Sequence, residues 1–250
     1  MEINKIYLGD CLELMQGISD KSIDMILCDL PYGTTNCKWD TVIPFEPLWQ
    51  QYERAIKDNG AIVLTSAEPF TSFLITSNIK LFKYDLIWHK THPKGHLNAK
   101  KAFMRAHENI CIFYRKPPIY NPQMTTGHYR KIAKTSYVTD PKKKDGAYGK
   151  QNRNTSYDST ERYPLSVISV SNGDMTNVLH PTQKPVALFE YLIRTYTNEG
   201  ALVLDNCAGS GTTGIACINT NRNFILMEKE ENYFHIAQER IFKLQLGDLY

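Results

Sequence analysis

A carboxylate, a proline and an aromatic ring stand together directly after a short apolar run of the sequence. The run covers residues 23–28 and continues into Asp29-Leu30-Pro31-Tyr32. Such a run predicts a strand that is covered on both faces of a sheet. A carboxylate at the end of that strand can stabilise positive charge on a substrate, and an aromatic ring can stack on a planar one. These four residues are the candidate catalytic site; the alternative is a structural acid that caps the next turn.

A glycine-rich turn follows a second apolar run, at residues 201–207. Gly209, Gly211 and Gly214 have the spacing of a turn that lets the backbone approach a ligand closely as a helix begins. The next predicted strand ends at Glu228, where a carboxylate can accept hydrogen bonds from both hydroxyls of a ribose. Taken alone, the pattern predicts a cofactor that contains adenosine and leaves NAD and S-adenosylmethionine open. A glycine turn without a ligand is the alternative.

Short apolar or β-branched runs alternate with helix-like segments along most of the chain, which predicts an α/β fold. The predicted strands cover residues 5–8, 23–28, 61–66, 84–89, 109–114, 201–207 and 223–227. The predicted helices cover residues 11–16, 45–57, 70–77, 185–196, 212–219 and 232–244. In the last helix, an apolar stripe that includes Tyr233 indicates packing against the core. Residues 116–177 are rich in Pro, Asn, Ser, Gly, Lys and Tyr, so we expect an inserted segment outside the central sheet.

The positive charge is concentrated in one third of the chain. The net charge of all 250 residues is only +3, but residues 80–163 contain 18 Lys and Arg against 6 Asp and Glu. Aromatic residues are interleaved with these cations, a mixture that suits neutralisation of a nucleic-acid backbone together with base stacking. The sequence therefore favours a nucleic-acid partner; a solvated surface is the alternative.

Several other classes of protein find no support in the sequence. The six cysteines form no CxxC pair and the histidines form no HExxH pair, so we expect neither a disulfide scaffold nor a metal site. The first residues lack the order of a signal peptide, and no apolar run approaches the roughly 20 residues that span a bilayer. We therefore expect a cytoplasmic protein without a membrane partner.

The tetrapeptide Asp29 to Tyr32 resembles the Asp/Asn/Ser-Pro-Pro-Tyr/Phe signature of the amino-group DNA methyltransferases, which act on adenine N6 or cytosine N4. It departs from the signature at Leu30, where the family usually has proline and where the backbone carbonyl makes the contact. Further similar motifs follow in a consistent order over nearly the whole chain outside the middle segment: Gly9-Asp10-Cys11, Trp88-His89-Lys90, His107-Glu108-Asn109, His180 to Pro185, Asp205 to Gly211, and Glu228. With the catalytic motif first and the cofactor motif last, this order is similar to that of the permuted β group of the family.

The resemblance implies a doubly wound, mostly parallel seven-stranded sheet, the S-adenosylmethionine-dependent methyltransferase fold, with strand order 3-2-1-4-5-7-6 and an antiparallel seventh strand. It implies one methyltransferase domain over residues 1–250, with a small inserted target-recognition segment at 116–177. The implied catalytic residues are Asp29, Leu30, Pro31 and Tyr32. The residues implied to bind S-adenosylmethionine are Asp10, Cys11, Asp29, Lys184, Asp205, Asn206, Cys207, Gly209, Ser210, Gly211, Thr212 and Glu228. The residues expected to contact DNA are Trp39, Trp88, Lys90, Lys142, Lys143 and Lys144.

The implied reaction is transfer of a methyl group from S-adenosylmethionine to the N6 amino group of an adenine flipped out of double-stranded DNA. Asp29 favours adenine, because serine at that position goes more often with cytosine N4 in this group. The N4-cytosine reaction stays open, as do a NAD-dependent oxidoreductase and a nucleic-acid-binding protein without activity. Carbon-5 methylation of cytosine is not supported, since none of the six cysteines follows a proline. Homodimers and companion restriction endonucleases occur in this family, and the sequence decides neither for this chain.

Overall fold

The computed structural model describes residues 1–35, 37, 39–135, 155–172 and 183–247, and the chain forms two compact units. The larger unit comprises Met1–Asn121 and Ser166–Tyr250, and the smaller one comprises Pro122–Leu165, within the predicted insertion. The strands described in the larger unit are β1 (Lys5–Leu8), β2 (Ile23–Asp29), β3 (Ile56–Ser66), β4 (Phe82–Lys94), β5 (Arg105–Phe113), β8 (Val167–Val170), β9 (Leu202–Asp205) and β10 (Asn223–Glu228). Its helices are α1 (Cys11–Leu14), α2 (Phe45–Ala55), α3 (Phe70–Ser77), α4 (Val186–Tyr196), α5 (Thr212–Asn219) and α6 (Glu231–Leu246), with the 3-10 turns η1 (Met15–Gly17) and η2 (His96–Asn98).

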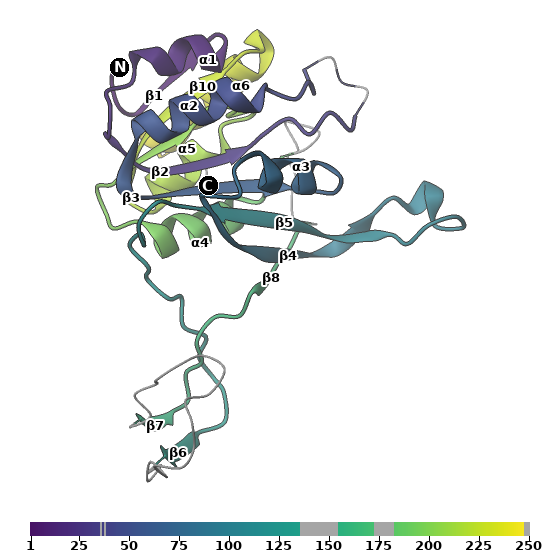
Figure 1. Cartoon of the computed structure of the whole chain (residues 1–250), viewed down its shortest axis with the longest axis vertical. Helices are drawn as coiled ribbons and strands as arrows, with labels where there is room; N and C mark the ends of the chain where they lie inside the picture. Colours follow the sequence, from purple (N-terminus) through teal and green to yellow (C-terminus); the bar gives the residue numbers. More distant parts are fainter. Residues whose placement is uncertain (36, 38, 136–154, 173–182, 248–250) are drawn as a thin grey trace. The chain divides into compact units, whose positions relative to one another are not determined.

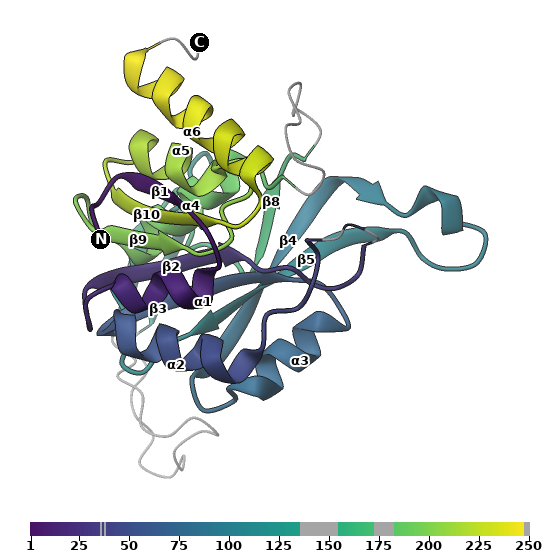
Figure 2. The ribbon, with the colours of Figure 1, turned by 90° about the horizontal axis from the view of Figure 1, so that it is seen from above.

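The strands of the larger unit form one sheet in the order β1-β10-β9-β2-β3-β5-β4-β8 (Figures 1 and 2). Neighbours from β1 to β3 pair in parallel, whereas β5 is antiparallel to both β3 and β4. The strands from β1 to β4 therefore have the predicted order 3-2-1-4-5-7-6, and the antiparallel strand is the predicted one. The prediction of a permuted, doubly wound sheet is confirmed.

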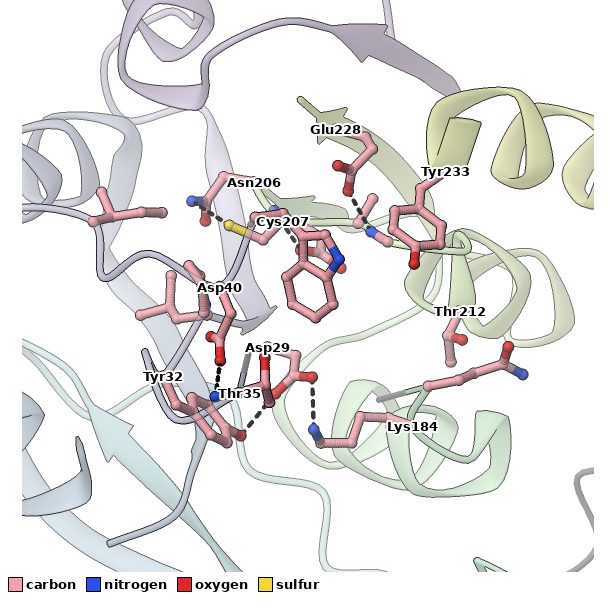
Figure 3. A pocket seen from close by; sticks show the side chains of 18 of the residues that line it. Asp29, Tyr32, Thr35, Asp40, Lys184, Asn206, Cys207, Thr212, Glu228 and Tyr233 are labelled. Atoms are coloured by element: carbon pink, nitrogen blue, oxygen red, sulfur yellow. Dashed lines mark hydrogen bonds and ion pairs between the residues drawn. The ribbon is translucent and has the colours of Figure 1, made fainter. Parts of the chain in front are cut away.

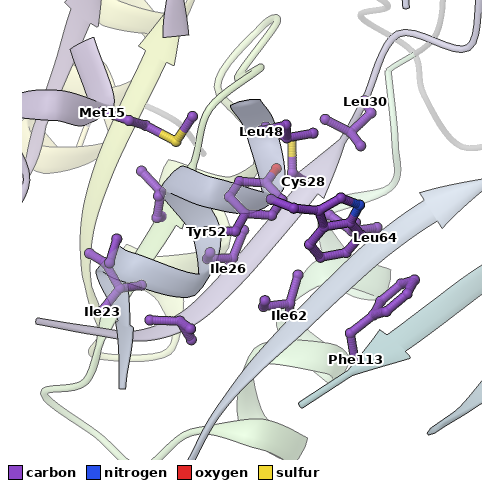
Figure 4. Close-up of a cluster of buried hydrophobic side chains, with 14 of the residues drawn as sticks. Met15, Ile23, Ile26, Cys28, Leu30, Leu48, Tyr52, Ile62, Leu64 and Phe113 are labelled. Atoms are coloured by element: carbon purple, nitrogen blue, oxygen red, sulfur yellow. The ribbon is translucent and has the colours of Figure 1, made fainter. Parts of the chain in front are cut away.

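Side chains of the buried strands alternate between two hydrophobic clusters, one on each face of the sheet. In β2, Ile26 and Cys28 belong to the cluster that α1, α2 and α3 cover (Figure 4), and Met25 and Leu27 belong to the cluster that α4, α5 and α6 cover. Since successive side chains of a strand point to opposite faces, a run without polar residues requires a helix layer on both. In the described part of the chain, no helix combines the length and the apolar character that crossing a bilayer requires.

β9 and β2 are neighbours in the sheet, and the chain leaves them in opposite directions. From β9 it continues through α5 to β10, and from β2 it continues through α2 to β3 on the other side. These two helices cover opposite faces of the sheet, so the loops after β9 and β2 separate and leave a crevice at the carboxyl edge. Asp205 ends β9 and Asp29 ends β2. The fold thus brings both predicted motifs to one crevice.

Three parts of the sheet differ from the expectations. β3 begins at Ile56, within the predicted helix 45–57 and before the predicted strand 61–66. β8 pairs in parallel with β4 and adds an eighth strand, so the prediction that residues 116–177 lie wholly outside the sheet is wrong. β4 continues to Lys94 and β5 begins at Arg105, so their hairpin is longer than the predicted strands 84–89 and 109–114. An apolar run at residues 165–170 is visible in the sequence and contains β8, but the run is short and β8 has one buried residue; the outer hairpin is exposed and has no such run.

The smaller unit contains a two-stranded antiparallel ribbon formed by β6 (Lys131–Thr135) and β7 (Thr155–Ser159). Next to the ribbon, the guanidinium of Arg130 pairs with both carboxylate oxygens of Asp158 at 2.7 Å. The three consecutive lysines at 142–144 lie outside the described residues. Their contact with DNA stays a prediction.

Candidate active site

A cavity of about 650 Å³ opens at the carboxyl edge of the sheet, at the crevice between β9 and β2. Its walls come from the ends of β1, β2, β9 and β10, the loop after β2, and the hairpin of β4 and β5. Figure 3 shows Asp29, Lys184, Cys207 and Glu228 around this space. The predicted catalytic and cofactor residues that line it are Asp10, Cys11, Asp29, Leu30, Pro31, Tyr32, Lys184, Asp205, Asn206, Cys207, Gly209, Ser210, Thr212 and Glu228.

Three side chains hold the Asp29 carboxylate. Tyr32 donates its phenolic hydrogen to Oδ1 at 2.7 Å, and Thr65 of β3 donates to the same oxygen. Lys184 Nζ lies 2.6 Å from Oδ2. A carboxylate oxygen has two acceptor positions, so these contacts fill Oδ1 and leave one position on Oδ2. Asp29 can therefore accept a further hydrogen bond from a substrate through Oδ2.

Lys184 belongs to a row of buried charges of alternating sign. Its ammonium also lies 3.3 Å from Glu108 Oε2, and the other oxygen of Glu108 pairs with Lys90. Burial opposes the charge of Lys184, but the carboxylates of Asp29 and Glu108 outweigh burial and raise the pKa of Lys184 above its ordinary value. Lys184 was predicted on the cofactor side of the site; the structure shows its ammonium paired with Asp29, the predicted catalytic acid.

Asp40 fixes the loop that follows the catalytic tetrapeptide (Figure 3). Its carboxylate accepts hydrogen bonds from the backbone N–H groups of Gly33, Thr34 and Thr35 at 2.8, 2.9 and 2.7 Å. Burial opposes the charge, but the Thr35 hydroxyl and these N–H groups lower the pKa of Asp40. Leu30 packs into the core, so its burial and the Asp40 contacts supply the restraint that a proline ring would give. Sequence reasoning missed Asp40, because a single acid in a loop forms no motif.

Glu228 offers acceptors suited to a ribose. Gly209 N–H donates to its Oε2 at 2.7 Å and Glu230 N–H donates to its Oε1 at 2.8 Å, so each oxygen keeps one acceptor position. Burial raises the pKa of Glu228 above its ordinary value, although these N–H groups act in the opposite direction. Asp10 lies at the same edge, because β1 pairs with β10, and its carboxylate is 3.1 Å from Lys229 Nζ.

The glycine turn after β9 depends on close backbone packing. Asp205 accepts hydrogen bonds from Cys207 N–H at 3.0 Å and from the Thr213 hydroxyl. Burial raises the pKa of Asp205 to about 6. Gly211 precedes α5 with φ of 79°, and a Cβ there would lie 2.9 Å from Cβ of Ala237 in α6. Gly211 is not one of the residues that line the cavity. Because it has no side chain, it lets α5 and α6 pack closely.

Side chains from outside the motif brace the same turn. Tyr52 of α2 donates its hydroxyl hydrogen to Asn206 Oδ1 at 2.5 Å. Ser210 donates to Gln183 Oε1 at 3.0 Å, and Arg240 of α6 donates to the Ser210 carbonyl at 2.7 Å. The turn is therefore preformed by contacts with three separate segments.

The chemistry of the cavity wall fits S-adenosylmethionine. This cofactor presents an adenine amino group, two ribose hydroxyls and two positive charges, and each of these needs an acceptor or an anion. The lining of the cavity supplies four carboxylates, those of Asp10, Glu228, Asp205 and Asp29. The pyrophosphate of NAD would meet the same carboxylates, and the lining lysines Lys184, Lys90 and Lys229 are already paired with carboxylates. The donor set therefore favours S-adenosylmethionine over NAD.

The residues expected to contact DNA have different surroundings. Trp39 lines the cavity and meets Tyr233 edge to face, with 6.2 Å between ring centroids. Tyr233, predicted as core packing, thus belongs to the cavity wall. Trp88 is 2% exposed and its indole N–H donates to the Val170 carbonyl at 3.0 Å, and Lys90 is buried in its ion pair. Both residues line the cavity, so Trp88 and Lys90 can meet DNA only through a base that enters it, and their contact with DNA stays a prediction.

Comparison with known proteins places this chain among enzymes that modify DNA. The family model described as DNA methylase, N6_N4_Mtase, matches residues 23–239. The chain is 26% identical to the Type II methyltransferase M1.MboII of Moraxella bovis, over 99% of this chain and 100% of that protein. It is 27% identical to the Type II methyltransferase M.BglII of Bacillus subtilis, over 95% of this chain and 68% of that protein.

Solved structures give the same architecture. The complex of M1.HpyAVI with S-adenosylmethionine is similar with a TM-score of 0.62 at 25% identity, over 94% of this chain and 98% of that chain. The PvuII DNA methyltransferase, a cytosine-N4-specific enzyme, is similar with a TM-score of 0.66 at 17% identity, over 94% of this chain and 85% of that chain. The second likeness shows a shared fold.

Proposed function

This chain belongs to the DNA methylase family, and from that premise we propose that it is a site-specific DNA methyltransferase that methylates the N6 amino group of an adenine flipped out of duplex DNA. The cofactor is S-adenosylmethionine. The observation that carries the proposal is the position of Asp29: its Oδ2, with one acceptor position left, faces the cavity that Glu228 and the glycine turn also line.

The exocyclic amine of adenine needs help, because its lone pair is delocalised into the ring and makes it a weak nucleophile. The bound cofactor supplies the methyl group on a positively charged sulfur. Asp29 Oδ2 and the Leu30 carbonyl can each accept one amino hydrogen, which directs the nitrogen lone pair out of the ring plane and stabilises the charge that develops on nitrogen. Thr65, Tyr32 and Lys184 hold the carboxylate in place, so little reorganisation is required.

The target base must leave the duplex, since its amino group is otherwise paired. Tyr32 stacks on Phe70 with 5.1 Å between ring centroids, and Lys184 Nζ lies 5.5 Å from the Tyr32 centroid. These contacts fix the ring before a base arrives. Stacking of one base on an aromatic ring is worth roughly 1–3 kcal/mol. Tyr32, with Trp39 in the same wall, is the aromatic surface that we propose for the flipped base.

Adenine is proposed over cytosine on the identity of Asp29, because serine at this position goes more often with cytosine N4 in the permuted group. The similarity to the cytosine-N4-specific PvuII enzyme lies in the fold and does not bear on the base. The reading as a NAD-dependent oxidoreductase predicts tight binding of NADH, and titration with NADH and with S-adenosylmethionine separates the two.

The proposed macromolecular partner is double-stranded DNA, with residues 116–177 as the target-recognition segment. Replacing Lys142, Lys143 and Lys144 together with alanine should reduce the slope of log affinity against log salt by about 2.7, if each lysine neutralises one phosphate. An unchanged slope would discard that role. A homodimer, a companion restriction endonuclease and a cytoplasmic location stay predictions.

The test is to incubate the protein with mixed-sequence duplex DNA and labelled S-adenosylmethionine, digest the DNA to nucleosides, and identify the product by mass spectrometry. N6-methyladenine is expected. N4-methylcytosine would refute the choice of base, and absence of both would refute the activity on duplex DNA.

Asp29→Ala tests the role of the carboxylate in the same assay. Turnover should fall roughly 100-fold or more, because a preorganised group that stabilises developing charge is lost, while S-adenosylmethionine still binds. The matched control is Asp20→Ala, which removes an exposed carboxylate that pairs with Arg54 outside the cavity. Turnover retained in Asp29→Ala would favour a nucleic-acid-binding protein whose effect does not depend on catalysis.

A further inference from the structure

The hairpin of β4 and β5 extends beyond the rest of the sheet (Figures 1 and 2). Its strands pair as far as Lys94 opposite Arg105, and every residue from 91 to 105 is exposed. The Asn172 side chain accepts the His92 N–H at 2.9 Å and donates to the His92 carbonyl at 3.0 Å. The hairpin is thus tied at its stem to the segment that follows β8.

The end of this hairpin, residues 95–104, exposes large apolar side chains; we refer to it as the hairpin tip. Phe103 is fully exposed, Leu97 is 88% exposed and Met104 is 40% exposed. Burial of a phenylalanine side chain stabilises a fold by roughly 1.5–3 kcal/mol, and a fully exposed one contributes none of this. Apolar side chains gathered at an exposed tip mark a surface for interaction.

The same segment is strongly basic. Residues 91–107 contain Lys94, Lys100, Lys101 and Arg105 and no Asp or Glu. An apolar tip among cations matches a partner that offers apolar surface between rows of negative charge. Stacked base pairs between two phosphate backbones have that chemistry.

The basic stem leads into the catalytic cavity. Lys94 and Arg105 line the cavity that also contains Asp29. Both cations are exposed, so they lie at the rim of the cavity. A base that enters the cavity remains attached to its strand, and a duplex that approaches along this part of the rim would meet the hairpin tip.

On the basis of the proposed function, we propose that the hairpin tip binds the DNA duplex at the target site, with Phe103 inserted in the stack where the flipped base has left a gap. Lys94, Lys100, Lys101 and Arg105 bind the neighbouring phosphates. Insertion of an apolar side chain into a base step offsets part of the stacking that is lost when a base flips. The hairpin is therefore a second DNA-binding element, separate from residues 116–177.

The test compares Phe103→Ala, Phe103→Trp and the control Phe242→Ala, which removes a 58% exposed phenylalanine on α6. The DNA is a duplex oligonucleotide that contains the methylated sequence mapped on plasmid DNA, with a fluorescent base analogue at the target position, such as 2-aminopurine for adenine. Phe103→Ala should raise the Kd of this duplex roughly 5- to 100-fold and reduce the fluorescence increase on binding, or lower kcat/KM by a similar factor on the same duplex with adenine at the target position, because 2-aminopurine lacks the amino group that is methylated. Phe103→Trp should restore both, and the control should leave both unchanged.

The same measurements give the outcomes that overturn the proposal. Because Phe103 is fully exposed, its replacement should leave thermal unfolding and S-adenosylmethionine binding unchanged. If the unsubstituted protein methylates DNA and Phe103→Ala matches it in flipping and kcat/KM, the inference fails and the proposed function stands. If Phe103→Ala instead lowers the molecular mass in solution, the tip binds a second copy of the chain. If the unsubstituted protein methylates no DNA, the proposed function fails, and the inference fails with it.

Lys100→Ala with Lys101→Ala tests the phosphate contacts independently. The pair should reduce the salt slope of DNA binding by about 1.8, because each lost phosphate contact changes it by about 0.9. Lys243→Ala is a control, since Lys243 pairs with Glu239 on the exposed side of α6. A slope equal to that of the unsubstituted protein would show that these lysines do not contact phosphate, contrary to the proposal.

Discussion

Replacing Asp205 with asparagine should remove a pH dependence of folding that the buried carboxyl group creates. Burial raises the pKa of Asp205 from 3.8 to about 6, although hydrogen bonds from the Thr213 hydroxyl and the Cys207 N–H act in the opposite direction. Between these pH values, the folded protein keeps a proton that the unfolded chain has lost.

The sign of the effect follows from this difference in bound protons. Because the folded state binds more protons between about pH 4 and 6, the free energy of unfolding decreases as the pH rises through this range. The stabilising contribution is fully present below about pH 4 and is lost once the pH passes about 6. A pKa difference of about 2.2, at 1.36 kcal/mol for each pH unit, amounts to about 3 kcal/mol at pH 7.

The assay is urea denaturation of the unsubstituted protein and of Asp205→Asn from pH 4 to pH 8. Asparagine has nearly the size of aspartate and does not titrate, so relative to the unsubstituted protein the variant should gain about 3 kcal/mol between pH 4 and pH 7. Asp158→Asn is the control: Arg130 lowers the pKa of this exposed carboxyl, so its pH dependence should be small and opposite in sign. A difference between Asp205→Asn and the unsubstituted protein that stays constant with pH would refute the reasoning.

The site supports further predictions. Lys184→Met should lower the free energy of unfolding by about 3–5 kcal/mol in urea denaturation, because Asp29 and Glu108 lose the cation between them, and Lys184→Arg should recover part of the loss. Glu228→Gln should weaken S-adenosylmethionine binding measured by calorimetry. In the unsubstituted protein, acidification should weaken S-adenosylmethionine binding as Glu228 becomes protonated, and this should begin above the ordinary carboxyl pKa because burial raises the pKa of Glu228. Glu228→Gln should remove this pH dependence. Asp40→Ala should make the loop after the tetrapeptide sensitive to limited proteolysis and lower kcat, since three backbone N–H groups lose their acceptor; an unchanged cleavage rate would contradict that role.

The sheet could be predicted because its buried strands carry a local pattern. Residues 23–28 and 201–207 are almost wholly apolar, and that pattern records coverage on both faces. The order of the strands came from the order of the motifs, through the family resemblance. The strand at Val167–Val170 lies in a short apolar run, but the residues around it are typical of turns, so the run alone did not place it in the sheet. The exposed outer half of the β4–β5 hairpin has no apolar periodicity that distinguishes it from a loop.

The site residues could be predicted where a side chain able to bind or react coincides with a local sequence pattern. Asp29 and Glu228 are acids at the ends of apolar strands, and the glycine turn has its own spacing. Thr65 and Asp40 carry no comparable signal, because their roles depend on hydrogen bonds to residues that approach only in the folded chain. The pairing of Lys184 with Asp29 joins segments far apart in sequence, and no spacing rule relates them.

The alternating row of charges explains why Asp29, the proposed catalytic acid, depends on three distant segments. An isolated carboxylate in this crevice would be costly to bury. The crevice holds two largely buried carboxylates, so a single lysine would leave one of them without a neutralising charge. The row contains two negative charges, on Asp29 and Glu108, and two positive charges, on Lys184 and Lys90, and each charge lies next to one of opposite sign. Because β4 and β5 supply Lys90 and Glu108, the strands whose hairpin extends toward the solvent also complete the electrostatic support of Asp29. A movement of the hairpin would therefore change the electrostatic support of Asp29, the carboxylate that we propose to orient the target amine.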